Sequence, residues 1–108
     1  MTDASNRARR NRQRGIDAER RAIKDLERVG YEVIRAAGSH GTFDLVAYGP
    51  LGCRFVQIKT DTVNSRVALA REAVAEADLP PHSTGELWRW QAEKRGGTWQ
   101  IEIVRKPK

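Results

Sequence analysis

Apolar side chains recur along the chain with two different periods, and these periods predict its helices and strands. Between residues 15 and 29 the apolar positions, among them Ile16, Ile23 and Leu26, follow one another at helical spacing. Shorter apolar runs, separated by glycine and proline, are typical of strands joined by turns. In chain order we predict a helix (15–29), three strands (31–37, 43–48 and 53–60), a second helix (66–77) and two more strands (87–91 and 99–104).

This order of elements, α-β-β-β-α-β-β, predicts a single α/β (α+β) domain with a mixed sheet flanked by helices. The turn at residues 49–52 (GPLG) joins the second and third strands into an antiparallel hairpin, and residues 93–97 join the last two strands in the same way. We therefore expect a central, mostly antiparallel sheet. Three tryptophans lie in the last hairpin, and their alternating positions favour a place in the core or in an interface.

The first 14 residues lack apolar periodicity and hold five arginines against one aspartate, a net charge of +4 out of +6 for the whole chain. We predict a basic flexible arm (1–14) preceding one folded domain (15–108). A solubility tail is the alternative, but phosphate binding explains the arginines better. They are Arg7, Arg9, Arg10, Arg12 and Arg14.

The charge and a pI of about 10.1 indicate an anionic partner, either nucleic acid or an acidic membrane surface. The arm has no apolar face, which favours nucleic acid. Cys53 is the only cysteine, so one chain can form neither a disulfide nor a cysteine-based zinc site. We find no signal-peptide pattern and no apolar run of membrane-spanning length, and therefore expect a cytoplasmic protein.

Glu19 lies three residues after Ile16 and four before Ile23, which places a carboxylate on the inward face of the first helix. Burying an unpaired carboxylate is costly, so a cation, a metal ion or an arginine must compensate its charge. The alternative is a boundary glutamate that reaches solvent or pairs with Arg20 or Lys24.

Asp44 stands near the start of a predicted strand, although aspartate disfavours strands. It is either a turn residue at the strand's edge or a functional ligand. Gln57 and Lys59 are two residues apart on the neighbouring strand and therefore point to the same face. The hairpin lets Asp44, Gln57 and Lys59 converge, an arrangement that suits a metal and an activated water.

Oxygen ligands suit Mg²⁺, which can neutralise a phosphate and acidify a bound water, while a lysine orients that water and stabilises negative charge. A helix glutamate, a strand aspartate and a Q-x-K strand resemble the pattern of the PD-(D/E)XK nucleases. Several short motifs in order are similar to those of the archaeal Holliday junction resolvases. They are RG (14–15), AER (18–20), GYEVIRAAGS (30–39), FDLVA (43–47) and VQIK (56–59).

The resemblance implies a restriction-endonuclease-like core and a symmetric homodimer that cuts four-way DNA junctions with Mg²⁺, for which Mn²⁺ can substitute. It implies metal binding by Glu19, Asp44, Gln57 and the backbone carbonyl of Ile58, and DNA contacts by Arg20 and Arg35. The catalytic residues that it implies are Glu19, Asp44, Gln57, Lys59 and Ser39.

Gln57 is a departure, because most relatives have glutamate there. Its amide oxygen still serves as a ligand but carries no charge, so we expect weaker metal binding; loss of activity is the alternative. Two other functions remain open: a nicking, repair or restriction-type nuclease with the same chemistry, and an inert DNA-binding module.

Overall fold

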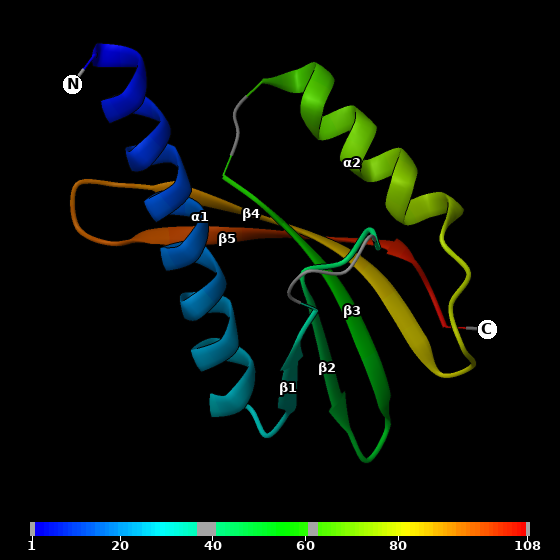
Figure 1. Ribbon diagram of the computed structural model, residues 1–108. Coiled ribbons are helices and arrows are strands. Elements are labelled where there is room, and N and C mark those ends of the chain that lie inside the picture. Colours follow the sequence, from blue (N-terminus) through cyan, green and yellow to red (C-terminus); the bar gives the residue numbers. More distant parts are fainter. Residues whose placement is uncertain (1, 37–40, 61–62, 108) are drawn as a thin grey trace.

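The computed structural model describes residues 2–36, 41–60 and 63–107 and contains two helices and five strands in the predicted order (Figure 1). Each observed element overlaps its predicted range. The elements are α1 (Asp3–Arg28), β1 (Glu32–Arg35), β2 (Leu45–Gly49), β3 (Gly52–Lys59), α2 (Asn64–Glu76), β4 (Ser83–Ala92) and β5 (Gly97–Arg105).

The strands form one sheet in the order β1-β2-β3-β4-β5. Every neighbouring pair is antiparallel except β3 and β4, which are parallel. A parallel pair needs a long crossover, and α2 supplies it. The expectation of a mixed, mostly antiparallel sheet is confirmed, and the architecture agrees with a restriction-endonuclease-like core.

The two helices cover opposite faces of the sheet, as two consecutive residues of β4 show. Trp88 belongs to the cluster that includes Leu26 of α1, whereas Leu87 packs with Val67 of α2. Successive side chains of a strand point to opposite faces, so the sheet lies between α1 and α2. The prediction of flanking helices is correct.

The tryptophans of the last hairpin hold α1 against the sheet. The indole N–H of Trp99 donates a hydrogen bond of 2.8 Å to the Asp25 carboxylate, and the Arg21 guanidinium lies 4.2 Å from the centroid of a Trp90 ring. The Trp90 and Trp99 rings meet edge to face, with 5.0 Å between centroids. Their predicted core role is confirmed.

Residues 3–14 are helical, so the prediction of a flexible arm is wrong. They form the first half of α1, which extends past the sheet (Figure 1). The hydroxyl of Thr2 accepts a hydrogen bond from the Ser5 N–H and caps this end, and Asp3 favours the positive end of the helix dipole. Residues 2–14 are all exposed, and apolar periodicity marks only a helix face that packs, so the sequence pattern did not reveal this extension.

Candidate active site

Asp44 lies at the open end of the β2–β3 hairpin, where its backbone joins two strands. Leu45 pairs with Val56, and the turn lies at the other end, where Gly49 pairs with Gly52. The Asp44 N–H donates to the Val56 carbonyl, and its own carbonyl accepts from the Ala36 N–H, both at 2.9 Å. Its carboxylate accepts from the Ile58 N–H at 2.8 Å. Asp44 is therefore fixed by backbone and side chain, although it precedes the regular strand.

A cavity of about 390 Å³ brings together three of the predicted catalytic residues: Glu19 from α1, Asp44 before β2, and Lys59 at the end of β3. Burial raises the pKa of Asp44, and the hydrogen bond from Ile58 acts in the opposite direction. The negative charge of Glu19 raises this pKa further, while Lys59 lowers it, with a net increase. The cavity therefore contains two carboxylates that repel each other and a lysine that attracts both.

Glu19 has a specific cationic neighbour. Its carboxylate accepts a hydrogen bond of 2.8 Å from Nε of Arg35 on β1. The Glu19 side chain is 21% exposed, so the carboxylate lies at the boundary of the core. The boundary interpretation is thus partly right, but the cation comes from a strand rather than from Arg20 or Lys24. This ion pair orients Glu19 beside the cavity.

Gln57 lies next to the cavity and does not line it. It shares the face of β3 that is opposite to Val56 and Ile58, and its side-chain amide donates to the Ile58 carbonyl at 3.4 Å. Ile58 itself lines the cavity. The Gln57 side chain thus contacts the backbone of a residue that lines the cavity.

The predicted DNA-binding arginines other than Arg35 lie on α1. Arg12 lines the cavity of Glu19 and Asp44. Arg14 lines another hollow, of about 510 Å³, beside Trp90, and Arg20 lies on a basic part of the helix with Lys24 and Arg28. The remaining arginines of the helical extension, Arg7, Arg9 and Arg10, are exposed. The predicted catalytic Ser39 falls outside the described residues.

The place of Arg12 in this cavity is the feature that the sequence interpretation missed. Arg12 and Glu19 are seven positions apart, which corresponds to about two helical turns, so the signal was present in the spacing. A flexible arm has no fixed face, so the spacing of Arg12 and Glu19 places them together only if the segment is helical.

The donor set of the cavity fits a hard divalent cation. Mg²⁺ commonly binds one or two carboxylates and keeps several waters, and Glu19 and Asp44 supply two carboxylates. The described residues contain no cluster of three or more His, Cys, Asp or Glu side chains suited to a metal, so a cation here would also depend on a backbone carbonyl and on water. The repulsion between Glu19 and Asp44 favours a cation near both carboxylates.

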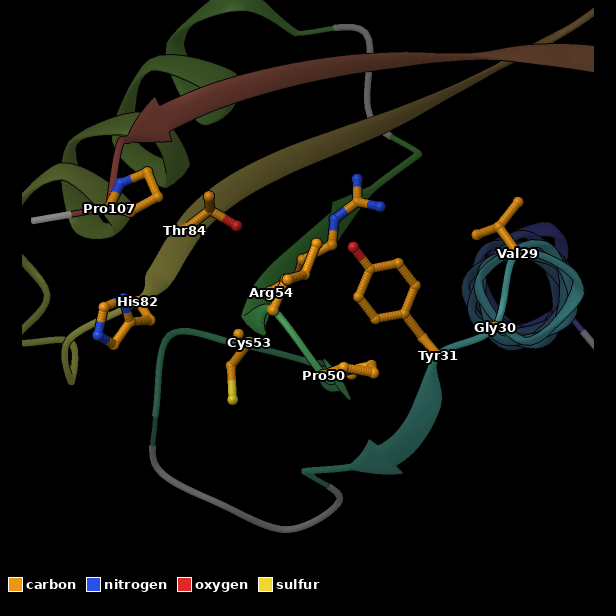
Figure 2. Close-up of a pocket in the computed structure, with 12 residues that line it drawn as sticks. Val29, Gly30, Tyr31, Pro50, Cys53, Arg54, His82, Thr84 and Pro107 are labelled. Atoms are coloured by element: carbon orange, nitrogen blue, oxygen red, sulfur yellow. The ribbon is translucent and has the colours of Figure 1, made fainter.

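A second cavity, of about 280 Å³, lies at the turn end of the same hairpin (Figure 2). Arg54 lines it and donates two hydrogen bonds, of 2.8 and 2.7 Å, to Glu86, which is 1% exposed. Tyr31 extends toward Arg54 from the other side (Figure 2), with 5.3 Å from the guanidinium to the ring centroid. Because Glu86 already neutralises Arg54, we assign this ion pair a structural role.

Comparison with known proteins places the chain in a family. The family model described as archaeal Holliday junction resolvase (Hjc) matches residues 10–78, which include Glu19, Asp44 and Lys59 and end before β4. A comparison with curated proteins gives no match. In the described part of the chain, neither helix is long and apolar enough to cross a membrane. Since the match covers more than half of the chain, this protein belongs to the archaeal Holliday junction resolvase family, within the PD-(D/E)XK nucleases.

Proposed function

We propose that this protein is a metal-dependent endonuclease that cuts four-way DNA junctions as a symmetric homodimer. The observation that carries the proposal is the shared cavity: Glu19, Asp44 and Lys59 come from three separate segments and meet in one place. Membership of a Holliday junction resolvase family supports a four-way DNA junction as the substrate. We include a dimer because cutting a four-way junction symmetrically requires two active sites related by two-fold symmetry.

In the proposed reaction, a water oxygen attacks phosphorus and the bond from phosphorus to a sugar oxygen breaks. The water gives up a proton and the leaving sugar oxygen takes one up from solvent, so one strand end carries a phosphate and the other a hydroxyl. Glu19, Asp44 and the Ile58 carbonyl would hold Mg²⁺, or Mn²⁺ in its place. The bound cation would supply charge neutralisation and a more acidic water. The Lys59 ammonium, in the same cavity, would orient the attacking water and stabilise the charge that develops on the phosphate oxygens.

The neighbouring residues would hold this arrangement in place. Arg35 orients Glu19 through the 2.8 Å ion pair, and the exposed part of its guanidinium is available to DNA. Gln57 would offer a neutral amide oxygen beside Ile58, which contributes less metal affinity than a carboxylate. The arginines of α1, including Arg20, would bind backbone phosphates. Ser39, outside the described residues, stays a proposed catalytic residue.

An inert DNA-binding module is the second candidate, and Gln57 is the observation that favours it. The residue carries no charge and lies outside the cavity. In that case Arg-rich α1 would bind DNA, and Glu19 and Asp44 would retain too little metal affinity for cleavage. A nuclease with the same chemistry and another DNA substrate is a variant of the first proposal, since a fold does not determine its substrate.

The test is cleavage of an end-labelled four-way junction beside a linear duplex of the same sequence, each with Mg²⁺ and with EDTA. Paired symmetric nicks in the junction alone, only with Mg²⁺, are the expected result. Cleavage of both substrates would identify a broader nuclease. Tight junction binding without cleavage, with Mg²⁺ or Mn²⁺, would establish the inert module.

A further inference from the structure

We propose that Arg12 is a catalytic residue that binds the phosphate being cut, in contrast to the other arginines of the helical extension. This inference rests on the proposed nuclease function. Its basis is the cavity itself, in which Arg12 is the only arginine beside Glu19, Asp44 and Lys59 among the described lining residues.

The helix fixes Arg12 relative to Glu19. α1 runs without interruption from Asp3 to Arg28, through Gly15, and seven residues correspond to about two turns and about 10 Å along the axis. Side chains at this spacing lie on the same face. Arg12 therefore keeps a constant position relative to Glu19, which a residue on a flexible arm would not do.

The guanidinium of Arg12 is available to a ligand. Among the described residues no carboxylate forms an ion pair with it, whereas Glu19 already holds Arg35. Arginine donates two parallel hydrogen bonds to a phosphate, a geometry that the single ammonium of lysine does not reproduce. In this cavity Arg12 and Lys59 would bind the phosphate while the two carboxylates hold the cation.

The neighbouring arginines differ in direction. Arg10 is two residues before Arg12, which turns its side chain by about 200° around the helix axis. It therefore points away from the cavity and would serve DNA binding alone. Arg95, on the exposed β4–β5 turn, carries the same charge and lies outside both α1 and the cavity. Arg95 is thus the matched control, since its removal changes the net charge equally and leaves the cavity intact.

The first experiment compares Arg12→Ala, Arg12→Lys and Arg95→Ala in single-turnover cleavage of the labelled junction at saturating protein with Mg²⁺, together with the Kd for the junction in EDTA. We expect Arg12→Ala to slow cleavage of the bound junction about 100-fold, the loss typical of removing one donor to a reacting oxyanion. Arg12→Lys should recover part of the rate, and Arg95→Ala should cleave at the wild-type rate. The Kd in EDTA separates a loss of binding from a loss of rate.

The second experiment changes the direction of Arg12 without changing charge. One alanine inserted after Gln13 rotates the preceding residues by about 100° and puts Gln13 seven residues before Glu19. We expect the rate loss of Arg12→Ala, with junction binding and helical circular dichroism close to wild type. An alanine inserted after Ser5, which leaves Arg12 in place, is the control.

Equal cleavage rates for Arg12→Ala and Arg95→Ala, with an active wild-type protein, would overturn the role of Arg12 alone. So would full activity of the insertion after Gln13. A wild-type protein that binds the junction and cuts nothing would overturn the proposed function, and this inference with it.

Discussion

The Asp44 carboxylate and the Ile58 backbone N–H are joined by a hydrogen bond of 2.8 Å. The bond connects the segment before β2 to the part of β3 that carries Gln57 and Lys59. A residue outside the regular strand is thereby held in register with the strand beside it. Substitutions of Asp44, Gln57 and Lys59 therefore test one connected site.

Asp44→Asn should greatly reduce Mg²⁺-dependent cleavage and remove the Mg²⁺-induced rise in Tm, while leaving the fold intact. The amide oxygen can still accept the hydrogen bond from Ile58, but the charge that favours a cation is removed. We expect cleavage to fall at least about 100-fold. We also expect Mg²⁺ to raise the Tm of the wild-type protein by a few degrees, since a ligand stabilises the state that binds it, and to leave the variant unchanged. Asp78→Asn, at an exposed position, is the control; an equal Mg²⁺ response in all three proteins would contradict the metal assignment.

Lys59→Ala should slow cleavage without a comparable loss of binding. Lys59 shares the cavity with Asp44 and, in the proposed reaction, acts mainly on charge that develops during the reaction. We expect the single-turnover rate to fall about 100- to 1,000-fold, with the junction Kd within about threefold of wild type. Lys94→Ala, on the exposed β4–β5 turn, should retain full activity. A rate for Lys59→Ala equal to that of Lys94→Ala would remove Lys59 from the mechanism.

Gln57→Glu should preserve or raise activity, because it adds a charged oxygen ligand beside Ile58. The Mg²⁺ concentration for half-maximal cleavage should fall, and a Mg²⁺ titration of the cleavage rate measures it. Gln91→Glu, at the exposed end of β4, adds the same charge elsewhere and should leave the titration unchanged. If Gln57→Glu folds but no longer cuts, Gln57 is not a metal ligand.

The buried pair of Arg54 and Glu86 should make the fold sensitive to acid. Burial raises the pKa of Glu86, but hydrogen bonds from Arg54, Thr84 and Trp88 outweigh it and hold the pKa below its ordinary value of 4.5. A lowered folded-state pKa gives a stabilisation that is fully present above pH 4.5 and disappears as pH falls through the lower folded value. Glu86→Gln should lower the free energy of unfolding at pH 7 by about 3 kcal/mol.

Thermal melts between pH 7 and pH 3 measure this dependence. The Tm of the wild-type protein should fall more steeply below pH 4.5 than that of Glu86→Gln, so the two curves converge in acid. Glu93→Gln, on the exposed turn, should parallel the wild type. Parallel curves for wild type and Glu86→Gln would refute the assignment.

Junction binding should weaken steeply with salt, because arginines that bind phosphates release counterions from the DNA. Replacing Arg7, Arg9 and Arg10 with alanine should reduce the slope of log K against log salt by about 0.9 for each phosphate that the variant no longer neutralises. Binding isotherms at several KCl concentrations give the slope. Arg28→Ala, at the other end of α1, is the comparison. A flat salt response of the wild-type protein would exclude the helical extension from DNA binding.

The sequence predicted the fold well where a side chain packs against the sheet. Leu26, Val56 and Trp88 are buried, and the apolar spacing around them located α1, β3 and β4. It also predicted that Asp44 and Lys59 meet, because hairpin register follows from the turn at residues 49–52.

Features without apolar periodicity could not be predicted in this way. The residues of the helical extension that the structure describes, 2–14, are all exposed, so their pattern resembles that of a loose segment. The Arg35 partner of Glu19 is 16 residues away and on another element, and helix spacing suggested only Arg20 or Lys24. Such pairs form only when separate elements pack together, and the local spacing of residues in one sequence does not reveal them.

The hydrogen bond between Asp25 and Trp99 joins residues 74 positions apart. During synthesis on the ribosome, α1 emerges well before β4 and β5. Until Trp99 and its strand have paired, the helix that carries Glu19 lacks a large part of its docking surface. The firm seating of Glu19 beside Asp44 therefore depends on strands that are made long after the helix.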